Sequence, residues 1–268
     1  MNSALIQPLP TCGGSALERT TIIEVPFEPA CHTVGSLALS DLDAQDPLDV
    51  AVQRKTFNIR LANNLGHRNK AGLLIRKMYS WRGYVLPIED GDRPNRLTLI
   101  AAEGDHTVGT LTLGFDSPVG LSVDQLYKTE IEPMRRQGRK LCEFTRLAVD
   151  RSIRSKQVLA ALFHIAYIYA HNILDHTDLF IEVNPRHVKF YERMLGFKRC
   201  GEERLNPRVN APGVLLTLEL DYVHRQLQEF GGKAELAGAE KSLYPYGFSP
   251  QEEGGITLAV EHLLMNGY

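Results

Sequence analysis

A carboxylate and a guanidinium lie three positions apart in one short apolar segment, Glu143-Phe144-Thr145-Arg146-Leu147-Ala148-Val149. A carboxylate can remove a proton from a nucleophile, and a guanidinium can grip another carboxylate through two parallel hydrogen bonds. Arg146 could therefore orient Glu143, bind an acidic group of a substrate, or support an oxyanion. These two residues are the first candidates for catalysis.

The spacing of Glu143 and Arg146 raises a geometric question, because side chains of a regular strand alternate between its two faces. Residues three positions apart then point to opposite faces. A β-bulge would bring both side chains to one face, and we expect such a bulge near Thr145. Unbroken alternation from Leu141 to Val149 would instead separate the two roles. Structural ion pairing is the alternative interpretation of both residues.

The loop that follows this segment is rich in hydrogen-bond donors and contains no glycine. It runs Asp150-Arg151-Ser152-Ile153-Arg154-Ser155-Lys156 and precedes an apolar helical pattern. The start of a helix attracts anions through free backbone N–H groups. We therefore expect an anion site here, with a solvated helix cap as the alternative.

Other chemically active side chains carry weaker signals. A basic cluster, made of Arg135, Arg136, Arg139 and Lys140, could steer an acidic partner or form a solvated surface. His164 and His171 share one stripe of an apolar helix without a nearby carboxylate, so we expect packing rather than metal binding. Cys142 has no histidine partner close in sequence, which argues against covalent catalysis.

Composition excludes several function classes. The chain has 268 residues, of which 43% are hydrophobic and 23% charged, as in ordinary globular proteins. A formal net charge of −2 argues against a general nucleic-acid-binding protein. The four cysteines form no C-x-x-C pair and are expected to be reduced thiols. The N-terminus does not have the pattern of a signal peptide, and no apolar run is long enough to span a bilayer. We expect a cytoplasmic protein without stable membrane insertion.

The segments that must position these residues alternate between strand and helix patterns. We expect a loosely ordered N-terminal arm over residues 1–48 with one edge strand at 21–25, and a C-terminal extension over 223–268 with a helix near 256–265. Within 49–222, helical patterns cover 49–79, 123–131, 158–171 and 186–195, and strand patterns cover 97–102, 108–114, 141–149, 179–183 and 214–220. The first two of these strands should form a hairpin. The order predicts one domain with a mixed α/β sheet flanked by helices.

Two motifs resemble known acyltransferases. The segment from Asn184-Pro185 through Phe190-Tyr191-Glu192 to Gly196-Phe197 resembles the last helix motif of the GNAT acyltransferase superfamily. The segment 143–147 resembles the Glu-x-Ser/Thr-Arg-Phe/Leu strand of acyl-homoserine lactone synthases. Both features together, with segments 77–84 and 108–116, are similar to bacterial long-chain N-acyl amino acid synthases, which include N-acyltyrosine synthases. The resemblance covers residues 50–222.

This resemblance implies a GNAT-like fold, with a mixed, mostly antiparallel sheet and helices on both faces. It implies an N-acyltransferase that moves a long acyl chain from an acyl-carrier protein thioester to the α-amine of an amino acid. Glu143 would be the general base, Arg146 would assist it, and Tyr191 would protonate the departing thiolate. The alternative for Tyr191 is packing. The resemblance leaves open the acyl length and the acceptor amino acid.

The resemblance also implies the sites for the acyl donor. No tightly bound cofactor is expected; the co-substrate would be acyl-phosphopantetheine on a carrier protein rather than acyl-coenzyme A, since the loop lacks the usual glycines. Its contacts would come from Val149, Arg151, Arg154, Ser155, Lys156 and Asn184. Asn184 has a second interpretation as a helix cap. The basic cluster would dock the carrier protein, and Trp81 and Tyr84 would line the substrate pocket.

Two other functions remain open at this point. An acyl-homoserine lactone synthase would use acidic and aromatic residues in its N-terminal third to hold S-adenosylmethionine. Asp90 and Asp92 stand in a different setting here, within Glu89-Asp90-Gly91-Asp92-Arg93-Pro94. The other alternative is a non-catalytic module that binds acyl carriers, in which Glu143→Gln would leave binding intact.

Overall fold

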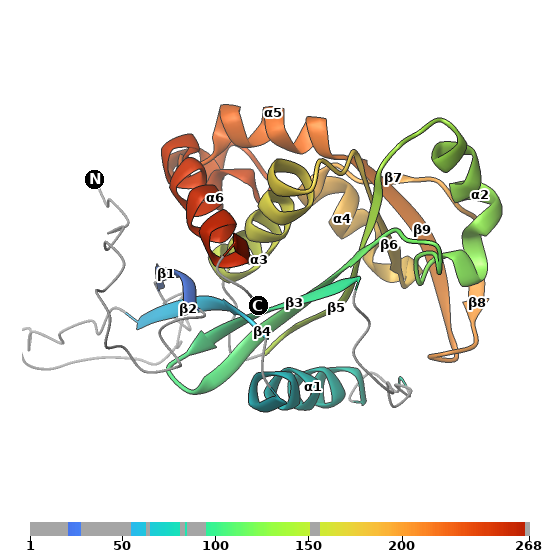
Figure 1. The fold of residues 1–268 in the computed structure, drawn as a ribbon, viewed down its shortest axis with the longest axis horizontal. Helices are drawn as coiled ribbons and strands as arrows, with labels where there is room; N and C mark the ends of the chain where they lie inside the picture. The colour runs from blue at the N-terminus through green and yellow to red at the C-terminus, as the bar shows by residue number, and fades with distance from the viewer. Residues whose placement is uncertain are drawn as a thin grey trace, which may run out of the picture.

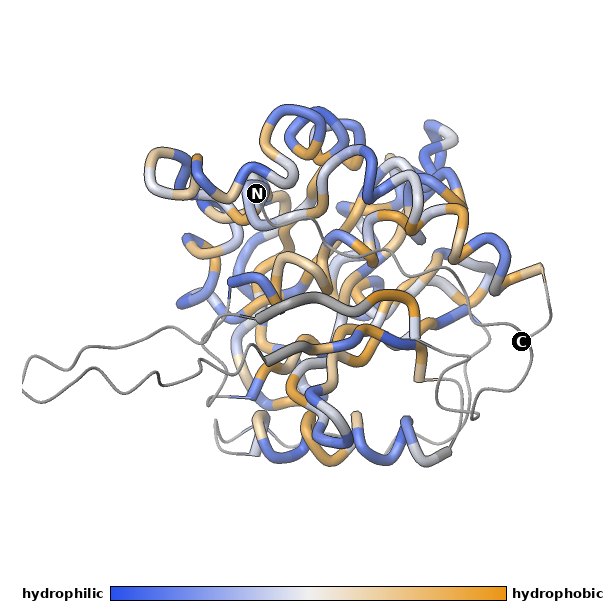
Figure 2. Tube along the Cα trace, turned by 90° about the vertical axis from the view of Figure 1, so that its left-hand side faces the viewer, coloured by the Kyte–Doolittle hydropathy of each residue, from blue (hydrophilic) through white to orange (hydrophobic). Residues whose placement is uncertain are grey.

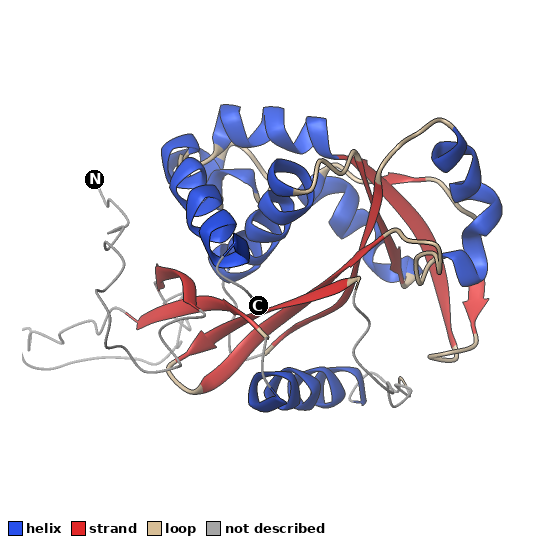
Figure 3. Ribbon diagram, in the orientation of Figure 1, coloured by secondary structure: helices blue, strands red, loops and turns tan. Residues whose placement is uncertain are grey.

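The computed structural model describes residues 21–27, 55–62, 65–80, 84, 95–150 and 156–265. Within them, nine strands form one twisted sheet with helices on both faces (Figures 1 and 3). The strands are β1 (Thr21–Phe27), β2 (Lys55–Leu61), β3 (Arg96–Glu103), β4 (His106–Phe115), β5 (Leu141–Val149), β6 (Asp178–Val183), β7 (Lys198–Arg199), β8 (Arg204–Asn206) and β9 (Ala211–Glu219).

The strand order is β1-β2-β3-β4-β5-β6-β9-β7, with β8 paired to β9. Every pairing is antiparallel except that of β5 with β6. The sheet is therefore mixed and mostly antiparallel, which confirms the expected fold class. The predicted hairpin is β3–β4, and the predicted edge strand is β1.

The parallel pair β5–β6 is short. It is paired only from Leu141↔Asp178 to Glu143↔Phe180, although β5 continues to Val149 and β6 to Val183. The two strands diverge beyond that point, so the centre of the sheet opens. Such an opening exposes strand ends where a substrate can enter the sheet.

The helices divide between the two faces of the sheet. They are α1 (Leu65–Ser80), α2 (Asp124–Arg136), α3 (Lys156–Tyr167) with the π-helical turn η2 (Ile168–Ile173), α4 (Val188–Leu195) after the short η3 (Pro185–His187), α5 (Leu220–Phe230), η4 (Ala234–Gly238), η5 (Tyr244–Tyr246) and α6 (Pro250–Met265). The main core packs α3 and α5 against one face, and α1 and α2 pack against the other. In Figure 2, hydrophilic and hydrophobic residues alternate along α1, as expected for a helix lying on a sheet.

Helix α3 is buried nearly all round, as its sequence predicts. Leu162, Ile165 and Ala166 are fully buried between the sheet and the C-terminal segment. Residues 223–265, treated above as a C-terminal extension, contribute Leu227 and Val260 to this same core. The helix predicted near 256–265 is the second half of α6.

Two sequence predictions are wrong in detail. The helical pattern expected over 49–79 contains strand β2, and the helix begins only at Leu65. Phe57, Ile59 and Leu61, at alternate positions, pack into the main core as expected of one face of a strand, and β2 hydrogen-bonds to β3. Tertiary pairing therefore overrides the local helical pattern. In addition, α5 forms where only a polar tail was expected, because Val223 and Leu227 pack into the core. Gly196 ends α4 at φ 81°, as predicted.

Among the described residues, no helix combines the length and apolar character needed to cross a membrane.

Candidate active site

Strand β5 contains the predicted bulge. The register with β4 shifts between Thr110 and Thr112, so that Leu111 opposes both Arg146 and Leu147. Arg146 has a φ of 54°, a left-handed conformation that costs a non-glycine residue about 1–2 kcal/mol. Backbone strain of this kind is concentrated at functional sites.

The bulge turns Arg146 to the face of the sheet that carries α1. Arg146 lines a cavity together with Tyr79 of α1, and the next but one residue, Ala148, packs against the same helix. Glu143 also points to this face, where its side chain lies over Gly114 of β4. The bulge thus places Glu143 and Arg146 on one face, as expected.

Glu143 itself is 1% exposed and lies behind the cavity wall. Its Oε2 accepts a hydrogen bond of 3.1 Å from the Val123 amide, and its Oε1 is 3.7 Å from Nη2 of Arg96. Arg96 also donates to the Ser122 hydroxyl, and both of those residues line the cavity. Glu143 is therefore connected to the cavity through Arg96.

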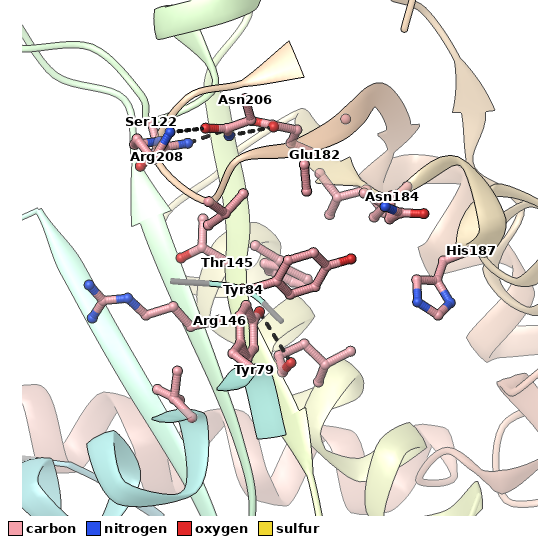
Figure 4. A pocket seen from close by; sticks show the side chains of 18 of the residues that line it. Tyr79, Tyr84, Ser122, Thr145, Arg146, Glu182, Asn184, His187, Asn206 and Arg208 are labelled. Carbon is pink, nitrogen blue, oxygen red and sulfur yellow. Dashed lines mark hydrogen bonds and ion pairs between the residues drawn. The ribbon is translucent and has the colours of Figure 1, made fainter. Parts of the chain in front are cut away.

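The cavity has a volume of about 460 Å³ and lies where β5 and β6 diverge (Figure 4). Its polar side chains come from α1, β3, β5, β6, η3, α4, β8 and several connections; they are Arg76, Tyr79, Tyr84, Arg96, Ser122, Thr145, Arg146, Glu182, Asn184, His187, Tyr191, Asn206 and Arg208. Phe144 and Phe163 also line it, and they stack in the core on the α3 side at 5.9 Å. We call the part of the wall with Phe144 and Phe163 its apolar end, and the part with Arg146 and Glu182, on the opposite face of the sheet, its polar end.

Glu182 is a cavity carboxylate that the sequence analysis missed. Its Oε1 accepts a hydrogen bond of 2.6 Å from Asn206 Nδ2, and its Oε2 lies 3.5 Å from Nη2 of Arg208 (Figure 4). Burial raises the pKa of Glu182, and the nearby charge of Glu143 raises it further. One sequence signal could have found it, since it is the only charged residue in the apolar strand Leu179-Phe180-Ile181-Glu182-Val183.

Four guanidinium groups, those of Arg76, Arg96, Arg146 and Arg208, line this cavity. Burial lowers the pKa of Arg146, and the positive charge of Arg208 lowers it further. Partly buried positive charges that line one cavity favour the binding of an anion there. The polar end is therefore suited to a carboxylate.

Several predicted residues do line the cavity. Tyr84 accepts a hydrogen bond of 2.9 Å from Arg186 Nη2, and Tyr191 packs edge-on against Phe197. The Asn184 side chain accepts from the Arg186 amide at 3.2 Å, so its capping role is confirmed.

Other predicted residues lie elsewhere. Val149 and Lys156 are described but are not part of the cavity wall, and Lys156 Nζ lies 5.3 Å from the centre of the Tyr246 ring. Four predicted residues lie outside the described part of the chain: Trp81, Arg151, Arg154 and Ser155.

The basic cluster divides into two pairs. Arg135 is half-buried and binds Asp116 and Asp124 through hydrogen bonds of 2.5–3.0 Å. Arg139 binds the buried Asp178 at 2.5 Å. Arg136 and Lys140 are exposed. Arg135 and Arg139 thus hold the fold around β5, whereas Arg136 and Lys140 present charge to solvent.

Cys142 is fully buried, and burial raises the pKa of its thiol well above the usual range. A protonated, inaccessible thiol is a poor nucleophile. Across the described residues, no three His, Cys, Asp or Glu side chains gather in a way that would hold a metal ion. The chemistry of the site therefore rests on carboxylates, guanidinium groups and tyrosines.

Comparison with known proteins finds one matching family. A family model described as N-acyl amino acid synthase FeeM matches residues 70–219, which are 150 of the 268 residues. The chain is similar to the solved structure of FeeM, an N-acyl amino acid synthase from uncultured soil microbes: 27% identity, a TM-score of 0.58, and coverage of 62% of this chain and 93% of that one.

More distant similarity extends to other acyltransferases. An acyl-CoA N-acyltransferase from Pseudomonas aeruginosa is 15% identical with a TM-score of 0.43, covering 60% of this chain and 97% of that one. The CoA-dependent acyl-homoserine lactone synthase BjaI is 16% identical with a TM-score of 0.42, covering 59% and 78%. Among curated protein sequences, none matches.

Proposed function

Because the chain belongs to the FeeM family of N-acyl amino acid synthases and is an N-acyltransferase, we propose that it transfers a long-chain acyl group from a carrier-protein thioester to the α-amine of an amino acid. The observation that carries this proposal is a cavity whose wall contains both arginines and phenylalanines. An amino acid needs the first environment and an acyl chain needs the second.

The acceptor amino acid would lie at the polar end. Its carboxylate would bind between Arg146 and Arg208, whose mutual repulsion it would relieve. A guanidinium group binds a carboxylate through a planar pair of hydrogen bonds, which also fixes the orientation of the acceptor. Tyr79 and Tyr84 lie beside this end, with ring centres 5.9 Å apart. They would form the wall that contacts the acceptor side chain.

The acyl thioester would enter through the opening between β5 and β6. Phe144 and Phe163 would contact the acyl chain, while Asn184 would contact the pantetheine amides. For the phosphate, the sequence-based assignment of Val149, Lys156 and the intervening loop remains our proposal. Exposed Arg136 and Lys140 would attract an acidic carrier protein. No tightly bound cofactor is needed, and the enzyme would work in the cytoplasm.

Aminolysis of a thioester sets three requirements. The ammonium must lose a proton, the tetrahedral oxyanion needs hydrogen-bond donors, and the departing thiolate needs a proton. Tyr191 lines the cavity and would supply the last proton. Arg96, held by Glu143, would face the developing oxyanion. The family resemblance implies that Glu143 is also the general base, and the comparison of Glu143 and Glu182 variants described in the next subsection tests that prediction.

The direct test is a reaction with purified protein, a long-chain acyl-carrier protein thioester and each amino acid in turn. Mass spectrometry should detect an N-acyl amino acid, and Glu143→Ala should abolish it. Acyl-homoserine lactone formed from S-adenosylmethionine would support the lactone synthase alternative. Retained carrier-protein binding without any acylated product would identify a non-catalytic module and overturn the proposal.

A further inference from the structure

Two carboxylates, the buried Glu143 and the partly buried Glu182, lie on the same face of the sheet near the cavity, and they differ in access. Glu143 is paired with Arg96 and the Val123 amide behind the cavity wall. Glu182 is part of the wall itself. We propose that Glu182 binds the α-ammonium of the acceptor amino acid and takes its proton, while Arg208 holds the acceptor carboxylate beside it. This inference rests on the proposed function and assigns the base within the same site.

The position of Glu182 follows from the diverging strands. Parallel pairing ends at Glu143↔Phe180, and Thr145 and Glu182 are the next residues on that face of β5 and β6. Both line the cavity, with Thr145 on one side of the opening and Glu182 on the other (Figure 4). An amine placed in the opening would therefore meet the Glu182 carboxylate.

The hydrogen bonds of Glu182 leave one oxygen available. Asn206 donates to Oε1 and holds the carboxylate in place. Within the described part of the chain, Oε2 is buried and accepts no hydrogen bond, and its ion pair with Arg208 is long at 3.5 Å. A buried acceptor of this kind is costly unless a donor from a ligand completes it. An ammonium group would supply that donor.

Arg208 explains why the ammonium would arrive at this point. An α-amino acid carries its carboxylate and its ammonium on one carbon, so binding one group fixes the other nearby. Arg208 lies beside Glu182 and lines the same cavity as Arg146. A carboxylate held by Arg208 would therefore place the ammonium next to Glu182 Oε2. This arrangement recognises an α-amino acid and disfavours a simple amine.

The environment of Glu182 also suits a base. Burial raises its pKa, with Glu143 adding to the shift and Asn206 opposing it. A carboxylate of higher pKa removes a proton from an ammonium group more readily, because the pKa difference between base and nucleophile is smaller.

The proton transfers balance as follows. The Glu182 carboxylate takes one proton from the ammonium, and the freed lone pair of the nitrogen attacks the thioester carbonyl carbon. The C–N bond forms as the carbonyl electrons move onto oxygen, and the C–S bond breaks when they return. Tyr191, the proposed donor, gives its phenolic proton to the departing sulfur. The second proton of the nitrogen then restores the proton of Tyr191. The first proton leaves Glu182 for solvent, so the net products are an amide, a thiol and one proton.

The test measures kcat and KM for the amino acid across a range of pH in the wild type and in Glu182→Gln. Glutamine keeps the acceptor for Asn206 but cannot take a proton. We expect kcat near neutral pH to fall about 100-fold or more. The part of the pH profile set by the Glu182 carboxyl should disappear, and the remaining activity should follow the fraction of acceptor whose amine is already neutral. Glu130→Gln is the matched control, since Glu130 forms an ion pair with Arg204 outside the cavity. It should keep the wild-type profile.

A second acceptor substrate shows whether Glu182 acts as a general base or only supports the structure of the site. An α-aminooxy acid keeps the carboxylate but has an amine that is already neutral near pH 7. Glu182→Gln should use it at close to the wild-type rate, because no proton must be removed before attack. A defect that persists with this acceptor would overturn the proposal.

The outcome for Glu143 completes the design. If Glu143→Gln loses the carboxyl-dependent part of the pH profile and is rescued by the aminooxy acid while Glu182→Gln is not, Glu143 is the base and this inference is wrong. If the wild-type enzyme acylates no amino acid, the proposed function fails first, which is a distinguishable result.

Discussion

The Glu143 side chain lies directly over Gly114, its partner on β4. A Cβ atom at Gly114 would come within 2.8 Å of Glu143 Cγ and 2.9 Å of Oε1. Gly114 also pairs with Arg96 on its other side. The glycine therefore leaves the space through which Glu143 and Arg96 reach each other across the middle strand. The second cavity carboxylate has a similar neighbour, since a Cβ at Gly213 would come within 2.5 Å of Glu182 Oε1.

Gly114→Ala should displace Glu143 and weaken its pairing with Arg96. Overpacking of this kind costs about 1–3 kcal/mol, so we expect a lower melting temperature and a loss of acyl transfer with the fold retained. Circular dichroism and the mass-spectrometric assay measure the two effects. Gly254→Ala is the matched control, because nothing lies within 4 Å of a Cβ there.

The control variant should raise stability by about 0.5–1 kcal/mol, since Gly254 is a glycine inside helix α6. It should leave activity unchanged. An equal loss of activity in Gly114→Ala and Gly254→Ala would contradict the role assigned to Gly114.

Arg146→Asn should separate backbone strain from chemistry. Asparagine tolerates the left-handed conformation better than arginine does, so the free energy of unfolding should not fall. The proposed carboxylate contact would be lost, and KM for the amino acid should rise by at least about tenfold, which corresponds to one charge-assisted hydrogen bond. Steady-state kinetics with chemical denaturation test both statements; an unchanged KM would exclude Arg146 from acceptor binding.

Substitutions in the basic cluster should have two different effects, on carrier-protein binding or on stability. Arg136→Glu and Lys140→Glu should weaken carrier-protein binding, most strongly at low salt, because exposed charges act by screened attraction. Arg135→Ala should instead lower the melting temperature, because it leaves Asp116 and Asp124 without their shared cation. Binding of the carrier protein at two salt concentrations makes the distinction. Lys128→Glu, a change at an exposed residue of α2 outside the basic cluster, is the control.

Acid should loosen helix α6 through Glu253. Burial alone would raise the pKa of Glu253, yet hydrogen bonds from His164 and Asn172 bring it below the ordinary value of 4.5. A lowered pKa in the folded state adds stability above pH 4.5, and this stability is lost as the pH falls through the folded-state pKa. Hydrogen exchange of the α6 amides should therefore accelerate in acid. In Glu253→Gln, which does not titrate, this acceleration should be much smaller.

Local patterns in the sequence determined most of the framework. The hairpin of β3 and β4, the buried helix α3, the glycine stop after α4 and the mixed sheet all follow from periodicity and turn residues over short windows. Segments 143–147 and 184–197 indicated the family relationship, because each motif lies within one strand–turn–helix unit. The bulge near Thr145 was predictable only as the condition for uniting Glu143 with Arg146.

The tertiary structure decided which residues share the cavity. Arg96, Glu182 and Arg208 are separated by many residues in sequence, and no local pattern relates them. They meet because β5 and β6 diverge after one short stretch of pairing, a property of the whole sheet. The sequence also could not show which carboxylate reaches the cavity. Glu143 is enclosed by Arg96 and Val123, whereas Glu182 lines the opening. Packing between distant segments, rather than residue type, separates these two carboxylates.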